Sequence, residues 1–188
     1  MAQHKIIFAG PVGAGKTTAI RSLSDIPIVA TDEEATDMTA NRKPKTTVAM
    51  DYGLIKLDSG ERVHLYGTPG QERFDFMWDI LTEGGLGLVL MLDNTRINPF
   101  QDMSFYINAF KDFIEETQLV IGVTRMDEAR KPELTEYVKH LASFGMVVPI
   151  FEVDAREKRD VSLLVQALLF SIDPGVETDV KTGLERRG

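Results

Sequence analysis

The amino-acid sequence predicts an α/β fold, a doubly wound and mostly parallel six-stranded sheet with one antiparallel edge strand. Short apolar runs alternate with helical patterns along the chain, an order typical of parallel strands joined by crossover helices. Two neighbouring runs are separated only by a tight-turn sequence, which makes one strand antiparallel to the next. The chain has 188 residues, of which 43% are hydrophobic, and this is enough for one domain with its own core.

The expected strands are short and apolar. Residues 86–92 are apolar at nearly every position, as in a central parallel strand that is covered on both faces. The turn that contains Ser59 and Gly60 favours a hairpin, because glycine adopts the backbone angles that a tight turn needs. The predicted strands span 5–9, 47–57, 62–66, 86–92, 119–123 and 146–153.

Helices are expected between and after these strands. Asn98 caps one of them, because its side chain can accept a bond from a free backbone N–H, and Pro99 suits the first helical position. We expect this helix to continue through Phe110 to Ile114, since apolar residues recur there on one face. The other helices are predicted over 18–23, from Pro132 to 141, and over 161–172.

A phosphate-binding loop follows the first strand. The run reads Gly10-Pro11-Val12-Gly13-Ala14-Gly15-Lys16-Thr17. Glycines allow successive backbone N–H groups to turn inward around an anion, and the next helix points its N-terminal dipole at the same group. In such a P-loop NTPase, Lys16 would contact the β- and γ-phosphates and the Thr17 hydroxyl would bind Mg²⁺. The predicted phosphate-side ligands are Gly10, Pro11, Gly13, Ala14, Gly15, Lys16, Thr17 and Thr18.

A second glycine-containing segment, residues 67–74, follows the third predicted strand. Small residues there allow the backbone N–H of Gly70 to approach a terminal phosphate. Gln71 can hold a water molecule in line for attack on that phosphate. The alternative interpretation is an ordinary strand-to-helix turn, in which Gly and Pro are common. We predict Lys16, Gly70 and Gln71 as catalytic residues.

The segment after the fifth predicted strand indicates a base-binding site. Asp127 can accept hydrogen bonds from N1–H and the 2-amino group of guanine, whereas adenine offers neither donor. Arg125 can lay its stem and planar guanidinium across the base. The alternative is that Asp127 caps the following helix. The full predicted set on the base side is Thr124, Arg125, Asp127, Ala155 and Arg156, the last two as backbone contacts to the guanine O6.

Together these segments resemble the Ras-like small GTPases over nearly the whole chain. Two runs, 45–53 and 66–71, are similar to a bacterial branch of that family, which includes gliding-motility GTPases that pair with roadblock-domain proteins. The resemblance implies a GTPase domain over 1–173, and the polar, charged composition of 174–188 predicts a flexible tail. It also implies GTP or GDP as the ligand, Mg²⁺ as the cofactor, and a roadblock-type activator or effector as the partner.

The chain departs from the family pattern at two positions. Arg125 stands where the family usually has Lys. Gly67 stands where the family usually has an Asp that supports Mg²⁺ through a water molecule. We hypothesise that Asp51 reaches the same metal shell from the neighbouring strand; the alternative is an outward-facing Asp on an edge strand. The predicted metal ligands are therefore Thr17, Asp51 and Thr47.

Two further roles in the loops follow from the same resemblance. Thr46 and Thr47 both qualify as the switch threonine that senses Mg²⁺ and the γ-phosphate, and Thr47 is our choice. Arg42 and Arg73 are candidates for an arginine that neutralises charge on the transferred phosphoryl group, with a plain surface charge as the alternative for each. We include Arg42 among the catalytic predictions.

Composition excludes several other functions. A net charge of −8 disfavours a nucleic-acid partner, which needs a basic surface. The absence of cysteine excludes disulfides and gives no sign of secretion. The longest apolar run is too short to span a bilayer, and the chain enters its first strand without a signal peptide. We therefore expect a cytoplasmic protein with no integral membrane segment.

The sequence thus predicts a Mg²⁺-dependent GTP-binding and GTP-hydrolysing molecular switch in a bacterial regulatory system. Two alternatives stay open. The chain could be a GTP-binding scaffold with little hydrolysis, which the Gly67 departure favours and Gln71 disfavours. It could also be a P-loop ATPase, which Asp127 disfavours.

Overall fold

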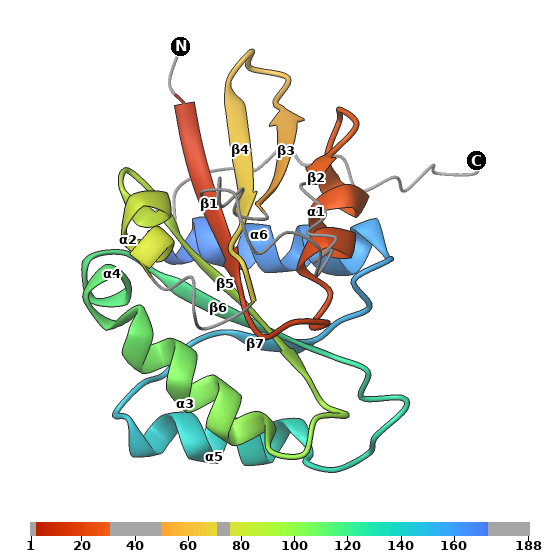
Figure 1. The fold of residues 1–188 in the computed structure, drawn as a ribbon, viewed down its shortest axis with the longest axis vertical. Helices are drawn as coiled ribbons and strands as arrows, with labels where there is room; N and C mark the ends of the chain where they lie inside the picture. Colours follow the sequence, from red (N-terminus) through yellow and green to blue (C-terminus); the bar gives the residue numbers. More distant parts are fainter. Residues whose placement is uncertain (1–2, 31–49, 71–75, 173–188) are drawn as a thin grey trace, which may run out of the picture.

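The computed structural model describes residues 3–30, 50–70 and 76–172 of the chain. Within these residues, one seven-stranded sheet runs in the order β2-β3-β4-β1-β5-β6-β7, with helices on both faces (Figure 1). The strands are β1 (Gln3–Ala9), β2 (Val29–Ala30), β3 (Asp51–Lys56), β4 (Arg62–Gly67), β5 (Gly87–Asp93), β6 (Leu119–Thr124) and β7 (Ile150–Glu152). The helices are α1 (Lys16–Leu23), α2 (Phe76–Thr82), α3 (Pro99–Ala109), α4 (Lys111–Glu116), α5 (Leu134–Ser143) and α6 (Lys158–Ile172).

The strand pairing confirms the predicted fold class. β1 pairs in parallel with β4 and β5, and β5, β6 and β7 continue the parallel ladder. β3 is antiparallel to β4, as the turn at Ser59 and Gly60 predicts. One detail differs: the two-residue strand β2 pairs with β3 and adds a seventh strand, so β3 lies one place in from the edge. Two residues are too short to give a strand pattern of their own.

Two apolar layers enclose the sheet. Along β1, Ile6 and Phe8 point into the layer beneath α1 and α6, while Ile7 points into the layer beneath α3 and α5. All three side chains are fully buried. This alternation follows from the two-residue period of a strand, and each such side chain contributes about 1.5–3 kcal/mol through burial. The layers fix β1 rigidly, and β1 carries the phosphate loop at its carboxyl end.

Several helix boundaries differ from the prediction: α1 begins at Lys16 and not at 18, α6 begins at Lys158 and not at 161, and α2 was not predicted. The single helix expected up to Ile114 ends at Ala109, and a separate short helix, α4, begins at Lys111. Phe110 between them is 3% exposed and stacks on Trp78 of α2 at 4.9 Å between ring centroids. This tertiary contact has no counterpart in the local sequence pattern. None of the helices in the described ranges is long and apolar enough to cross a membrane.

Helix α5 begins at Leu134 and not at Pro132 as predicted. Glu133 caps it through a reciprocal pair with Glu136, in which the Glu133 backbone N–H donates to the Glu136 carboxylate at 2.7 Å. Such a capping box satisfies backbone donors that a helix leaves free at its start. The last predicted strand, 146–153, is also shorter than expected and is reduced to β7.

Candidate nucleotide-binding site

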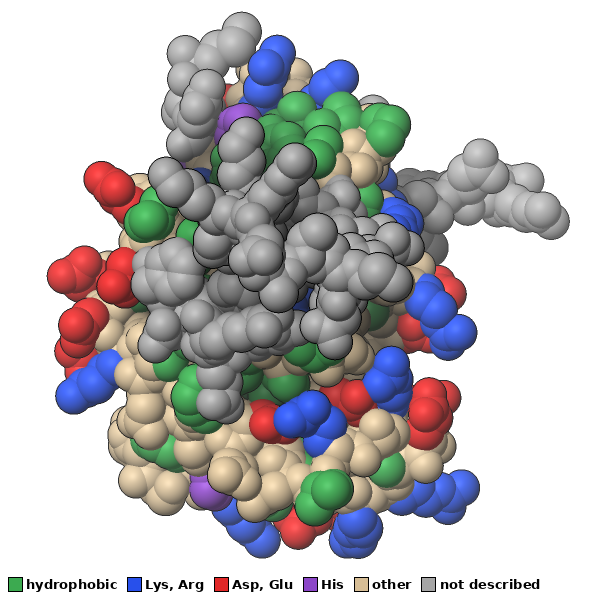
Figure 2. Space-filling view, viewed as in Figure 1, with side chains coloured by type: hydrophobic (Ala, Val, Ile, Leu, Met, Phe, Trp, Pro, Cys, Tyr) green, Lys and Arg blue, Asp and Glu red, His purple; other side chains and the backbone are tan. Residues whose placement is uncertain are grey.

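The candidate site is a cavity of about 650 Å³ beside the loop that joins β1 to α1. This volume is in the range of small-molecule sites. The cavity is open to the carboxyl ends of the parallel strands, where ligands bind in doubly wound sheets. Figure 2 shows acidic and basic side chains interleaved over this part of the surface. The lining residues are 13–15, Thr18, 124–128, 152–156 and Asp160.

Glycine is required at two positions of the phosphate loop. Gly10 has a φ of +143°, and a Cβ there would lie 2.1 Å from the backbone oxygen of Met91 in β5. Gly15 has a φ of +97°, and a Cβ there would lie 3.0 Å from the Ala155 Cβ. The loop is therefore packed tightly between β5 and the segment after β7, in backbone angles that other residues rarely adopt.

Lys16 is almost fully buried, at 7% exposed, in the first turn of α1. Its Nζ donates to the carbonyl oxygens of Gly10 at 2.7 Å and of Pro11 at 2.8 Å. Burial lowers the pKa of Lys16 to about 8, against the opposing attraction of Asp51, and the charge of Arg96 lowers it further. A bound polyanion would favour the charged form, so this lysine is poised for phosphate.

Asp51 lies against the Thr17 hydroxyl, which donates to its carboxylate. The two residues come from different elements, Thr17 from α1 and Asp51 from the start of β3. Asp51 is directly opposite Gly67 in the β3–β4 ladder. A Cβ on Gly67 would lie 3.0 Å from the Asp51 Cβ and 3.1 Å from its Oδ2. The Asp51 side chain therefore fills the space that a side chain at position 67 would need.

The chain after β4 approaches the phosphate loop closely. Thr68 donates its backbone N–H to the carbonyl oxygen of Phe8 in β1 at 2.8 Å, which fixes this segment beside the first strand. Two residues later, a Cβ on Gly70 would lie 2.6 Å from the backbone nitrogen of Val12 and 3.0 Å from the Lys16 Nζ. The structure thus places Gly70 within reach of the lysine that would meet a terminal phosphate.

On the base side, Thr124 ties the end of β6 to the phosphate loop. Its hydroxyl, in a residue only 5% exposed, lies 3.2 Å from the Ala14 carbonyl oxygen and 3.0 Å from the Leu92 carbonyl oxygen, and it can donate to either. Asp127 lines the same cavity. A ligand that rests on the phosphate loop can therefore reach Asp127 without leaving the cavity.

Arg125 has a φ of +58° and its guanidinium is paired with the Asp93 carboxylate at the end of β5. Asp93 is 5% exposed and also accepts from the backbone N–H and the hydroxyl of Thr95, at 2.9 and 2.6 Å. The sequence prediction missed Asp93. The signal that could have found it is a carboxylate at the end of an otherwise apolar strand, since buried charges are normally paired.

The segment after β7 is held by its own charges. Arg156 makes a two-pronged pair with Asp154, with Nε to Oδ1 at 2.9 Å and Nη2 to Oδ2 at 2.7 Å. These hydrogen bonds hold the pKa of the Asp154 carboxyl at about 2 and raise the pKa of Arg156. Asp160 of α6 accepts the Asp154 backbone N–H at 2.9 Å. Ala155 between them is 8% exposed and lines the cavity.

The structure brings most of the predicted site residues to one edge of the sheet. Arg42, Thr47 and Gln71, and the alternatives Thr46 and Arg73, lie outside the described residues. The predicted residues that gather around the phosphate loop and its cavity are Gly10, Pro11, Gly13, Ala14, Gly15, Lys16, Thr17, Thr18, Asp51, Gly70, Thr124, Arg125, Asp127, Ala155 and Arg156.

Comparisons with known proteins agree with this architecture. Ras-related protein Rab-27A of Sus scrofa is 26% identical over 182 residues, covering 88% of this chain and 76% of the relative. GTP-binding protein YPTM2 of Zea mays is 25% identical over 170 residues, covering 89% and 79%. An uncharacterized protein of Methanocaldococcus jannaschii, MJ1339, is 29% identical over 92 residues, and the match spans 52% of that relative and 49% of this chain.

The G domain of the FeoB iron transporter of T. maritima has the same fold. It superposes with a TM-score of 0.62 at 20% sequence identity, covering 89% of this chain and 98% of that domain. A family model described as "conserved hypothetical ATP binding protein" matches residues 8–175. Because this match spans most of the chain, the protein belongs to that family of conserved hypothetical ATP-binding proteins, on the fold of a P-loop GTPase G domain.

Proposed function

We propose that the protein is a Mg²⁺-dependent GTP-binding and GTP-hydrolysing molecular switch of a bacterial regulatory system. The observation that carries this proposal is a single cavity that joins the phosphate loop to Asp127 and Ala155. Such a cavity has a phosphate end, made by residues 13–15 of the loop, and a base end that Asp127 and Ala155 line. The similarity to Rab-27A and to a GTP-binding protein of Zea mays supports GTP as the ligand.

Asp127 is the basis for preferring guanine to adenine. Its carboxylate accepts hydrogen bonds and donates none when ionised, which suits the N1–H and 2-amino donors of guanine. Adenine would leave that acceptor unpaired, at a cost in affinity. The family description names ATP, so a P-loop ATPase is the second candidate. The two candidates differ in whether guanine or adenine binds at Asp127.

The residues around Thr17 fit Mg²⁺. The Thr17 hydroxyl and the Asp51 carboxylate are hard oxygen donors that already lie in contact, and Mg²⁺ binds through one or two such groups together with phosphate oxygens. When bound, the ion would neutralise charge on the β- and γ-phosphates. We propose Thr17 and Asp51 as its protein-side contacts, with Thr47 of the first switch as the third.

The chain's own residues would perform the remaining tasks of hydrolysis. Lys16 would bind the phosphates as a buried cation, and the backbone N–H of Gly70 would contact the terminal phosphate. Gln71 would orient the attacking water molecule, and Arg42 would add positive charge during transfer. Turnover should be slow without an activator, as is usual when positioning is incomplete. We propose a cytoplasmic protein that acts with a roadblock-type activator or effector.

Single-turnover hydrolysis tests this proposal. The protein is loaded with radiolabelled GTP or ATP, Mg²⁺ is added, and phosphate release is followed for the wild type and for Asp127→Ala. We expect slow release from GTP and far slower release from ATP, with the preference lost in the variant. Faster release from ATP than from GTP would make the ATPase the better assignment. Binding of GTP without measurable release would favour the scaffold.

A further inference from the structure

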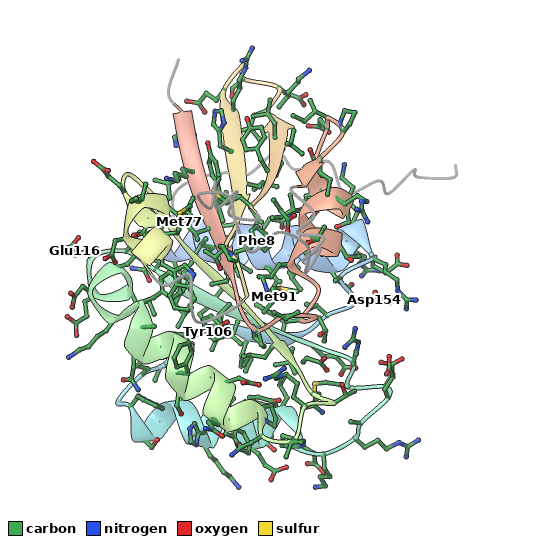
Figure 3. All side chains as sticks on the ribbon, in the orientation of Figure 1. Phe8, Met77, Met91, Tyr106, Glu116 and Asp154 are labelled. Atoms are coloured by element: carbon green, nitrogen blue, oxygen red, sulfur yellow. The ribbon has the colours of Figure 1, made fainter. Side chains whose placement is uncertain are left out.

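Tyr106, a buried side chain of α3, contacts both the chain that follows β4 and helix α2. Its hydroxyl donates to the carbonyl oxygen of Gly70 at 3.2 Å. Its ring lies 5.5 Å from the Trp78 ring of α2, centroid to centroid. The residue is 2% exposed and lies on the side of α3 that faces the sheet (Figure 3). One side chain therefore connects the phosphate side of the site to α2.

The Tyr106 hydroxyl donates to the Gly70 backbone, which packs closely against the phosphate loop. As described above, Gly70 approaches both the Val12 nitrogen and the Lys16 Nζ closely enough that even a Cβ would collide. A hydrogen bond to the carbonyl of Gly70 restricts rotation of this backbone. It therefore restricts the orientation of the Gly70 backbone relative to a group bound by Lys16.

The Tyr106 ring packs against Trp78, which other aromatic rings also contact. Trp78 is 3% exposed, and beside Phe110 and Tyr106 it also contacts Phe105 edge-on at 6.0 Å. Its indole nitrogen has no hydrogen-bond partner in the part of the chain that the structure describes. A small shift of the Tyr106 ring would therefore be passed to α2 through its direct contact with the Trp78 ring.

We infer that Tyr106 is a positioning residue that holds Gly70 in the conformation that meets a terminal phosphate and couples that conformation to α2 through Trp78. This inference rests on the proposed function, since Gly70 would face a terminal phosphate only in a triphosphate complex. A diphosphate has no group at that point, so the Tyr106 hydroxyl should favour the triphosphate over the diphosphate.

Tyr106→Phe tests the inference because it removes the hydroxyl and keeps the ring. The affinities for GDP and for a non-hydrolysable GTP analogue are measured by displacement of fluorescent GDP in the presence of Mg²⁺. We expect the affinity for the GTP analogue to fall roughly threefold to tenfold, the range that one neutral hydrogen bond gives. The affinity for GDP should stay unchanged.

Tyr137→Phe is the matched control. Tyr137 is also a buried tyrosine, and its hydroxyl donates to the Asn94 Oδ1 at 2.6 Å, away from Gly70. The same atom is removed, so any general loss of stability should be similar. We expect this variant to unfold at lower urea concentration than the wild type and to keep the wild-type ratio of GTP-analogue affinity to GDP affinity.

Trp78 provides a second, independent measurement, because it is the one tryptophan in the sequence. We expect its emission to differ between the GDP and GTP-analogue complexes of the wild type, and this difference to shrink in Tyr106→Phe. An unchanged affinity ratio in that variant, or identical wild-type emission in the two complexes, would overturn the inference while leaving GTP binding intact. A wild type that binds neither nucleotide would overturn the proposed function itself.

Discussion

Asp51 and Gly67 face each other across the β3–β4 ladder, and the Asp51 carboxylate occupies the space that a side chain on Gly67 would fill. The same carboxylate accepts the hydrogen bond of the Thr17 hydroxyl. We propose that this carboxylate takes the place of the Asp that the sequence resemblance leads us to expect at position 67. β3 begins and β4 ends at this point of the sheet, so either strand can place a carboxylate beside the Thr17 hydroxyl.

Asp51→Asn should weaken the Mg²⁺-dependent binding of nucleotide. The amide keeps the size of the side chain and removes its charge, so the Mg²⁺ concentration needed for half-maximal GDP retention should rise about 10-fold to 100-fold, as for other groups that support a bound metal. The measurement is the rate of fluorescent-GDP release across a Mg²⁺ series. An unchanged midpoint would mean that Asp51 has no role toward the metal.

Exchanging the two residues gives a sharper version of this test. Gly67→Asp alone should destabilise the fold, because its Cβ would lie 3.0 Å from the Asp51 Cβ. The double variant Asp51→Gly, Gly67→Asp removes that collision and returns a carboxylate to the other strand. We expect the double variant to recover Mg²⁺-dependent GDP retention that Asp51→Gly alone loses. Retention no better in the double variant would show that the two positions are not equivalent.

Nucleotide affinity should fall as the pH rises above about 8. The pKa of Lys16 is about 8 in the free protein, so the lysine loses its charge above that pH unless phosphate holds the proton on it. The same shift, downward from 10.5, means that the unfolded chain binds more protons than the folded one between these values. The free protein should therefore gain stability as the pH rises through this window.

Lys16→Met separates these two effects. This variant should bind GDP more weakly than the wild type at neutral pH. Its GDP affinity should not show the decline between pH 7.5 and about 10 that we expect of the wild type. Isothermal titration at several pH values measures the affinity, and urea unfolding of the free protein measures the stability. A wild-type affinity that stays flat across this range would contradict the assignment of Lys16 as the titrating phosphate ligand.

Gly10→Ala should be far more disruptive than Gly60→Ala. Both glycines have positive φ, +143° and +85°, but a Cβ on Gly10 would collide with the Met91 backbone whereas Gly60 has open space around it. We expect Gly60→Ala to cost about 1–2 kcal/mol of unfolding free energy from backbone strain alone. Gly10→Ala should cost more than about 3 kcal/mol or prevent folding. Similar urea midpoints for the two variants would contradict the packing of the loop against β5.

Thr124→Val should weaken both the fold and nucleotide binding. Valine keeps the shape and removes the hydroxyl that bridges toward the Ala14 and Leu92 carbonyls, which are then left without this donor. A loss of about 1–3 kcal/mol in unfolding free energy is expected for such a buried group. Thr117→Val is the control, because its hydroxyl bonds to the Phe113 carbonyl oxygen at the end of α4. The control should leave GDP affinity unchanged, and an equal loss in both variants would count against a local role for Thr124.

Local patterns explain why much of the fold could be predicted. The period of two along β1 and the continuous apolar run of β5 each reflect how many faces of the strand are buried, and burial leaves a direct mark on the sequence. The phosphate loop is similarly local, because its glycines are required by backbone angles within eight consecutive residues. The closeness of Asp51 to Gly67 could also be predicted, since it needs only the pairing of two strands joined by a tight turn.

Features set by long-range contacts could not be predicted in the same way. The break at Phe110 accompanies its stacking on Trp78, which is distant in sequence. The pairing of Arg125 with Asp93 joins the ends of β5 and β6 and depends on their register. The hydrogen bond from Tyr106 to Gly70 depends on how α3 lies across the sheet. In each case the local sequence around either partner gives no sign of the contact, which forms only in the folded chain.

We propose that the cavity beside the phosphate loop selects guanine through Asp127. The most direct measurement is a titration of the protein with fluorescent GDP in the presence of Mg²⁺, followed by competition with GTP and, separately, with ATP. We predict that GTP displaces the probe at micromolar concentrations and that ATP does not at a hundredfold excess, since adenine leaves Asp127 unpaired. Equal displacement by ATP would contradict the claim and assign the cavity to an ATP-binding protein.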